Sequence, residues 1–294
     1  MTDHGRYLLF DKLIFGYLAY IALICLAFGR PLSGFVDDLI VNALLAVGIV
    51  AVVHLNRRYD NGILRLLRYV YPALFFLYFY RQTGGLIHLF FPGFLDYHLT
   101  TFEKSILGIN FTLWIDQNLV NVWLNEIITF CYVLYYPMIP TFLFFLFAKK
   151  RYDLIASSLV AICITFFISY SLFFLYPIEG PRYFFADQYS STLPGFVFRP
   201  LVEYIMANSA VHGGCMPSSH VAVALVMLIF CLKYYRRIGI LMTPIVFGLA
   251  LGTFYGRFHY VSDVVVGAAI GAIVTALTLK YYRRPENADA AMER

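Results

Sequence analysis

Charged residues are scarce in this chain of 294 residues. Only 13% of the residues are Asp, Glu, Lys or Arg, whereas 61% are hydrophobic and the mean hydropathy is +0.73. Because average proteins carry about 25% charged residues, this composition excludes an ordinary soluble domain. It is typical of a polytopic membrane protein.

Other signals are missing as well. The five cysteines have neither the spacing of a disulfide framework nor that of a zinc site, and Cys215 is expected to line a pocket. The sequence contains no glycine-rich nucleotide loop, no internal repeat and no low-complexity run. The net charge of +5 comes from short basic clusters beside apolar runs. We therefore expect no metal, no cofactor and no nucleic-acid partner.

Apolar runs dominate what remains, and a spanning helix needs about 20 such residues. Eight runs qualify or nearly qualify, at residues 13–28, 36–55, 64–80, 127–147, 154–176, 221–235, 238–255 and 261–281. The first and third are short or carry charge near an end. We expect an all-α polytopic bundle of about eight transmembrane helices. Two helices would lie in residues 1–60, a six-helix catalytic core in 61–284 and a solvated tail in 285–294.

Basic residues beside alternate runs predict the orientation. The clusters are Arg57-Arg58, Lys149-Lys150-Arg151, Lys233 with Arg236-Arg237, and Lys280 with Arg283-Arg284. By the positive-inside rule these loops face the cytoplasm. The segment from Pro177 to Met216 and the turn around Arg257 then face the opposite side. We expect a multi-pass protein of a bacterial inner membrane with this face in the periplasm.

Two blocks at the starts of apolar runs hold candidate catalytic residues. In the later block, Asp263 follows His259 by four positions. On a helix this spacing places both side chains on one face, so the carboxylate can hold one ring nitrogen and leave the other free to attack. The pattern predicts His259 as a nucleophile that Asp263 orients.

The earlier block places Ser218, Ser219 and His220 at an expected helix N-terminus. Unpaired N–H groups and the helix dipole favour a bound anion such as phosphate there. Both serines are expected to donate hydroxyls to it, and His220 to protonate a leaving oxygen. The plain alternative for a histidine at such a place is a polar anchor at the membrane interface.

At these residues the chain resembles the type-2 phosphatidic acid phosphatase superfamily, whose members carry a Pro-Ser-x-His block and a later His-x-x-x-Asp block. Asp96, Glu103, Gly108 and the run Tyr135-Tyr136-Pro137 also resemble the branch of fungal inositol phosphoceramide synthase and its bacterial relatives. The resemblance extends from about residue 95 to 282. A single His-x-x-x-Asp is a weak pattern, whereas the paired blocks at segment starts are specific.

The chain departs from the family pattern at two places. Leu175 stands where typical phosphatases have the lysine of Lys-x6-Arg-Pro, and Gly252-Thr253 replaces a Ser-Arg pair ahead of the second histidine. Arg182 and Arg257 are then the candidates to bind phosphate oxygens through their planar guanidinium groups. Either arginine has a plain alternative, which is to contact lipid headgroups.

Phosphoryl transfer needs a nucleophile, an acid and fixed positive charge, and these residues supply all three without a metal. We expect a metal-independent lipid phosphatase or phosphotransferase that uses a phosphohistidine intermediate on a phosphorylated lipid headgroup. Hydrolysis and headgroup transfer of the inositol phosphoceramide synthase type remain open, because water and an alcohol use the same intermediate. A non-enzymatic transporter or scaffold is the alternative from another class.

The stretch from Arg81 to Glu126 is too polar to span a bilayer and belongs to the same non-cytoplasmic side. An amphipathic helix such as Trp114 to Leu124 is expected to lie in the interface. The stretch either roofs the site and admits a lipid laterally or simply connects two spans across the headgroups. The sequence does not choose between the two.

Overall fold

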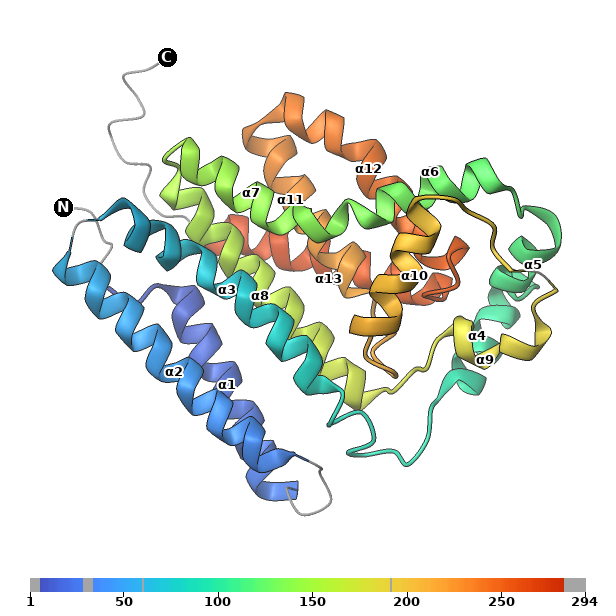
Figure 1. Cartoon of the computed structure of the whole chain (residues 1–294), viewed down its shortest axis with the longest axis horizontal. Helices are drawn as coiled ribbons and strands as arrows, with labels where there is room; N and C mark the ends of the chain where they lie inside the picture. The colour runs from blue at the N-terminus through green and yellow to red at the C-terminus, as the bar shows by residue number, and fades with distance from the viewer. Residues whose placement is uncertain (1–5, 29–33, 60, 191, 283–294) are drawn as a thin grey trace.

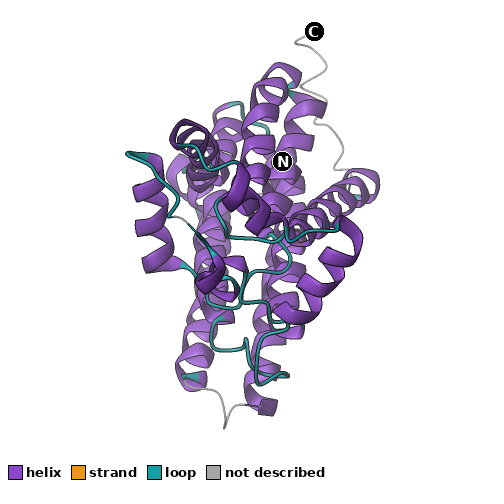
Figure 2. Cartoon of the chain, turned by 90° about the vertical axis from the view of Figure 1, so that its right-hand side faces the viewer, coloured by secondary structure: helices purple, strands orange, loops and turns teal. Residues whose placement is uncertain are grey.

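The computed structural model describes residues 6–28, 34–59, 61–190 and 192–282. Within these ranges all named elements are helices (Figure 2), so the expected all-α fold is confirmed. They are α1 (Leu9–Phe28), α2 (Phe35–Arg58), α3 (Gly62–Thr83), α4 (Asp96–Leu107), α5 (Phe111–Asn118), α6 (Val122–Val133), α7 (Tyr135–Ala148), α8 (Tyr152–Leu175), α9 (Pro181–Phe184), η2 (Ala186–Gln188), α10 (Phe198–Ser209), α11 (Ser219–Tyr234), α12 (Arg236–Tyr255) and α13 (Val261–Tyr281).

Six helices in the described ranges are long and apolar enough to cross a membrane, namely α1, α2, α3, α8, α12 and α13. The bent pair of α6 and α7 makes a seventh if it counts as one span, whereas we expected about eight. The pair bends by 40° at Leu134, just before Pro137, whose missing N–H is tolerated in the first turn of α7. The remaining expected span, α11, has only 16 residues.

The glycines of α13 let α11 lie directly against it. A Cβ atom on Gly267 would fall 2.4 Å from the carbonyl oxygen of Ser218, and one on Gly271 would fall 2.3 Å from that of Ala222. α11 also packs against α8 and α12. The starts of α11 and α13, where the two blocks lie, are therefore fixed against each other (Figure 1).

A buried ion pair explains how the charged first run can still be a helix inside the bundle. Asp11 of α1 accepts hydrogen bonds from Arg68 Nη1 at 2.7 Å and from the Tyr71 hydroxyl, both on α3. Asp11 is 0% exposed and Arg68 1% exposed. A charge in a membrane bundle needs such a partner, so the pair holds α1 against α3.

The expected amphipathic helix from Trp114 to Leu124 is wrong as a single element. α5 ends at Asn118 and α6 begins at Val122. Asn121 lies between them, and its side chain accepts hydrogen bonds from the N–H groups of Trp123 at 2.9 Å and Leu124 at 3.1 Å. An asparagine in this role starts a new helix, so the sequence contained the signal for the break.

The ends of the bundle differ in composition. α4, α5, α9 and α10 gather at one end, at the right of Figure 1. The basic clusters that end α2 and α7 and join α11 to α12 lie toward the left and top of the same view. Arg283, Arg284 and the expected tail 285–294 lie outside the described residues.

Candidate active site

The two blocks meet at the starts of α11 and α13. The Ser218 N–H donates a hydrogen bond to the carbonyl oxygen of Asp263 at 2.9 Å. The ring centroids of His220 and His259 lie 6.2 Å apart. Two histidines that are 39 positions apart in the sequence therefore face one small volume.

His259 approaches Asp263 for a different reason from the one expected. His259 precedes α13, so the two residues do not share a helix face. Asp263 caps the helix start instead, because its Oδ2 accepts the Tyr260 N–H at 2.8 Å. The His259 N–H donates to the carbonyl oxygen of Thr253 at 3.0 Å. The resulting distance from His259 Nδ1 to Asp263 Oδ2 is 3.4 Å.

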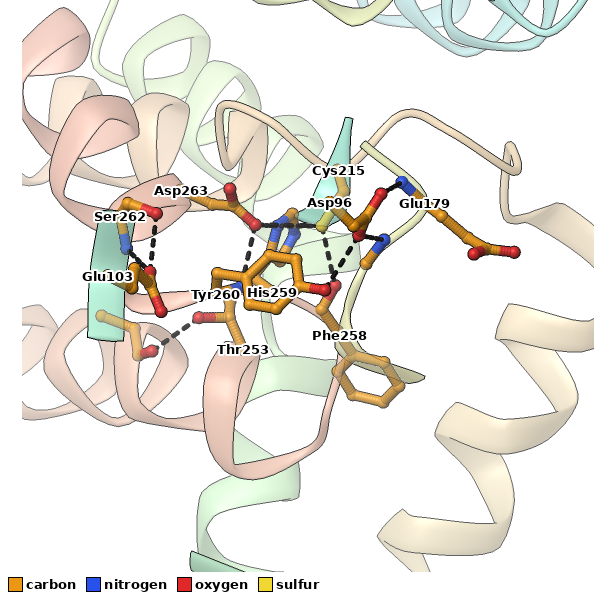
Figure 3. A network of polar contacts seen from close by, with 12 residues as sticks. Asp96, Glu103, Glu179, Cys215, Thr253, Phe258, His259, Tyr260, Ser262 and Asp263 are labelled. Atoms are coloured by element: carbon orange, nitrogen blue, oxygen red, sulfur yellow. Dashed lines mark hydrogen bonds and ion pairs between the residues drawn. The ribbon is translucent and has the colours of Figure 1, made fainter. Parts of the chain in front are cut away.

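Cys215 contacts both members of this pair (Figure 3). Its Sγ lies 3.0 Å from Asp263 Oδ2 and 3.4 Å from His259 Nδ1. Burial, and then the negative charge of Asp263, raises the pKa of the Cys215 thiol well above its usual value. The thiol is therefore protonated and unsuited to attack, in agreement with a lining residue. The Nδ1 edge of His259 faces these two groups, which leaves the Nε2 edge for a substrate.

Tyrosines surround His220, which lies in the first turn of α11. The ring centroids of Tyr132, Tyr135 and Tyr136 lie 5.5, 4.5 and 6.4 Å from that of His220. Burial, and then the neighbouring His259, lowers the pKa of His220 to about 3. The histidine is therefore neutral at neutral pH until a negative charge is placed beside it.

Several buried polar atoms of the site lack a hydrogen-bond partner within the described part of the chain. They are Ser218 Oγ, His220 Nδ1, Arg182 Nη1 and Asp263 Oδ1. Buried polar groups in folded proteins are nearly always paired, and exceptions point to water or a ligand. Three of these atoms belong to residues that the sequence assigned to phosphate binding or proton transfer. Ser219, the other expected donor, is 4% exposed at the start of α11.

Arginines form the positive wall of the site. Arg182 and Arg199 both pair with Glu203. Their guanidinium carbons lie 6.0 and 5.4 Å from the ring centroid of Phe258, which directly precedes His259. Arg199 and Glu203 were not predicted, although their spacing of four within an otherwise apolar stretch of the outer segment was a usable signal.

Arg257 is held in place by Asp116 and Tyr189. Its backbone adopts a φ of 65°, which is uncommon for a residue other than glycine. The side chain pairs with Asp116, and its guanidinium carbon lies 3.8 Å from the Tyr189 ring centroid. Burial lowers the pKa of Arg257, and the pairing with Asp116 opposes this shift. The positive charge of Arg182 lowers the pKa further, so the two arginines are close enough to repel each other.

These three arginines form one cluster of charge. Arg182 and Arg199 share Glu203, and Arg257 pairs with Asp116. Burial lowers the pKa of Arg199, Glu203 opposes that shift, and the positive charges of Arg182 and Arg257 add to it. A cluster of guanidinium groups of this kind favours an anionic ligand.

The stretch between Arg81 and Glu126 does more than connect two spans. Asp96 accepts hydrogen bonds from the N–H groups of Glu179 at 2.8 Å and Gly180 at 2.9 Å, and from the Tyr260 hydroxyl at 2.8 Å. Glu103 accepts the Ser262 hydroxyl at 2.6 Å (Figure 3). With Asp116 on Arg257, three carboxylates of this stretch fix the loops that carry Arg182, His259 and Asp263. Sequence alone left this role open.

A metal-ligating arrangement is also present. Among the described residues, Cys215, His259 and Asp263 offer ligand atoms that all lie within 4.8 Å of one another. Sulfur, nitrogen and carboxylate oxygen are the donors that zinc prefers. The sequence did not predict this group because Cys215 lies 44 positions before His259, far from any metal-ligand spacing.

Comparison with known proteins agrees with the resemblance of the two blocks. The model of the PAP2 superfamily matches residues 98–277. A PA-phosphatase related-family protein of Dictyostelium discoideum is 30% identical over 103 residues, which are 34% of this chain and 19% of that protein. The chain thus covers about a fifth of that relative's length. No solved structure matches. Because the family model covers more than half of the chain, including both histidine blocks, the chain belongs to the PAP2 superfamily.

Proposed function

We propose that this chain is an integral-membrane, metal-independent enzyme that removes or transfers the phosphate of a phosphorylated lipid headgroup through a phosphohistidine. Membership in the PAP2 superfamily supports a phosphatase-type, lipid-related function. The observation that carries the proposal is the pair of histidines, with ring centroids 6.2 Å apart, next to Arg182 and Arg199, which lie over the ring of Phe258 directly before His259.

The first half-reaction starts at His259. Nε2 attacks phosphorus and the bond from phosphorus to the lipid alkoxide oxygen breaks, while His220 gives a proton to that oxygen. Attack places phosphorus about 3–3.5 Å from Nε2, and proton transfer places the leaving oxygen about 2.7 Å from a nitrogen of His220. The two ring centroids lie 6.2 Å apart, so one phosphate group can contact both rings.

The second half-reaction releases the phosphate. His220, now neutral, takes a proton from water or from an alcohol, whose oxygen attacks phosphorus as the bond to His259 breaks. Water yields inorganic phosphate, and an alcohol yields a new phosphate ester. Asp263 stabilises the positive charge on the His259 ring in both steps, acting across 3.4 Å.

The equatorial phosphate oxygens would be held by Arg182, Arg199 and Arg257, with Ser218, Ser219 and the first N–H groups of α11 completing the cradle. Arg182 Nη1 and Ser218 Oγ support this role, because both are buried and lack a partner in the described ranges. With three guanidinium groups on the phosphate, no divalent ion is needed to neutralise it.

The proposal is tested by product analysis. Purified protein is incubated in EDTA with a panel of phospholipids and prenyl phosphates, with and without candidate alcohols, and products are identified by mass spectrometry. We expect metal-free phosphate release or transfer from at least one lipid. A protein that turns over no member of the panel, yet binds lipids, would instead fit the transporter or scaffold alternative.

Transfer to an alcohol is the second candidate function. It is favoured by Leu175 and Thr253, which replace the lysine and arginine of typical phosphatases of the family, and by the resemblance of Asp96 and Glu103 to the inositol phosphoceramide synthase branch. In the same panel, a transferase makes a new phosphate ester that grows with alcohol concentration at the expense of free phosphate. A hydrolase releases the same phosphate whether or not the alcohol is present.

A labelling experiment tests the side of the membrane. Gln188 lies in η2 among the site loops, and Lys150 lies in the turn between α7 and α8. We expect a membrane-impermeant thiol reagent to label Gln188→Cys in intact cells and Lys150→Cys only after lysis. The unmodified chain gives the background, because four of its five cysteines are buried. The reverse pattern would put the site in the cytoplasm.

A further inference from the structure

Cys215, His259 and Asp263 form a closed triangle of ligand atoms. The edges are 3.0 Å from Sγ to Oδ2, 3.4 Å from Sγ to Nδ1 and 3.4 Å from Nδ1 to Oδ2. Asp263 is 0% exposed, yet its Oδ1 has no hydrogen-bond partner among the described residues. The carboxylate thus has coordination capacity that the protein does not use.

These edges are close to one face of a zinc tetrahedron. Zinc bonds of about 2.3 Å to sulfur and about 2.0–2.2 Å to nitrogen and oxygen place the ligand atoms about 3.3–3.6 Å apart. The triangle needs to open by about half an ångström on its Sγ–Oδ2 edge and by less on the others. Thiolate and imidazole favour soft ions, whereas Mg²⁺ and Ca²⁺ prefer oxygen ligands.

We propose that Zn²⁺, or a cation of the same class, binds Cys215 Sγ, His259 Nδ1 and Asp263 Oδ2 and arrests the enzyme. Binding replaces the hydrogen bond from Cys215 to Asp263, and the thiol proton is released to solvent. The site is distinct from a catalytic metal centre, because the metal ion binds His259 Nδ1, and the reaction needs that nitrogen to carry a proton.

Inhibition follows from the tautomer of His259, and this step rests on the proposed function. A neutral imidazole has one N–H and one lone pair. Attack by Nε2 requires its lone pair and therefore the proton on Nδ1. A metal on Nδ1 moves the ring proton to Nε2, which then cannot attack phosphorus. Metal binding and phosphoryl transfer at His259 are mutually exclusive.

Metal binding is measured independently of enzyme activity, by following the absorbance of the metal-free protein during titration with Co²⁺. We expect an intense near-ultraviolet band of thiolate coordination with about one ion per chain. Cys215→Ser should abolish the band, although its hydroxyl can keep the bond to Asp263. Cys231→Ala, a change at a buried cysteine of α11, should keep it. Absence of the band in the wild type, or its persistence in Cys215→Ser, would overturn the site.

Inhibition is then measured as the loss of turnover of whichever lipid substrate in the panel reacts fastest. The protein is preincubated with Zn²⁺, because Cys215 and His259 are each only 5% exposed. We expect Zn²⁺ but not Mg²⁺ to inhibit, EDTA to restore turnover, and Cys215→Ser to need at least about tenfold more Zn²⁺, since even outer partners of metal ligands are worth about 10–100-fold in affinity. Equal inhibition of both forms, each relative to its own uninhibited rate, would refute the mechanism.

The two readouts separate the two proposals. A cobalt band in a protein that turns over no substrate leaves the metal site standing and removes the proposed function. A protein that turns over substrate, shows no cobalt band and is insensitive to Zn²⁺ would support the proposed function and refute the metal site.

Discussion

Replacing His259 with alanine is expected to abolish turnover, because the phosphohistidine cannot form. The fold should survive, since the backbone N–H of His259, and not its ring, makes the 3.0 Å hydrogen bond to Thr253. Wild-type protein quenched during turnover of a labelled substrate should carry acid-labile, base-stable phosphate. His259→Ala should carry none.

Asp263→Asn is the graded companion of that change. An amide in place of a carboxylate that orients a catalytic histidine costs about 10⁴-fold in rate in serine proteases, and a similar loss with a measurable remainder is expected here. The amide can still accept the Tyr260 N–H that Asp263 accepts at 2.8 Å, so the start of α13 is preserved.

His98→Ala is the matched control, because His98 is an exposed histidine of α4. It should turn over normally. Each variant is checked for monodisperse protein in detergent before its rate is compared. Normal turnover by well-folded His259→Ala would refute the nucleophile assignment.

The sequence indicated that His259 and Asp263 lie close together, but not the contacts that bring them together. His259 and Asp263 were expected to meet on a helix face, but they meet because Asp263 caps α13 and His259 precedes it. A spacing of four fits both arrangements. Only the position of the helix start separates them, and helix ends are the least certain part of any sequence-based assignment.

Contacts between distant segments could not be predicted. Arg199 lies in the first turn of α10, and the start of that helix depends on Glu126, which accepts the Arg199 N–H at 3.1 Å. Cys215 touches Asp263 only because α11 and α13 pack tightly at Gly267. Neither contact produces a periodicity or a spacing that can be recognised in the sequence. The apolar runs do produce such a pattern, and the sequence therefore predicted the helices that they form.

His220→Ala should distinguish substrates by their leaving group. A lipid alkoxide is a poor leaving group and needs a proton as its bond to phosphorus breaks, whereas nitrophenolate leaves without one. We expect turnover of a lipid phosphate to fall by about 10²–10⁴-fold, the usual contribution of general acid catalysis, and turnover of nitrophenyl phosphate to fall far less. Rates of both substrates are measured under single-turnover conditions, so that only the first half-reaction is read.

His220 can act as an acid only if it becomes protonated when the substrate binds. In the substrate-free protein burial lowers the pKa of His220 to about 3, so the ring is neutral at pH 7. A phosphate bound against the ring adds negative charge, which raises this pKa toward the range in which a histidine can act as an acid. The rate for the lipid substrate should therefore fall as pH rises above the pKa of the complex, and that dependence should disappear in His220→Ala.

Tyr135→Phe is the control for packing around His220. It removes a hydroxyl but keeps the ring whose centroid lies 4.5 Å from that of His220, so both substrates should change by the same factor. Equal losses for the two leaving groups in His220→Ala itself would mean that His220 binds phosphate or serves only the second half-reaction. A loss confined to the lipid substrate, together with the vanished pH dependence, leaves proton donation to the departing oxygen as the role of His220.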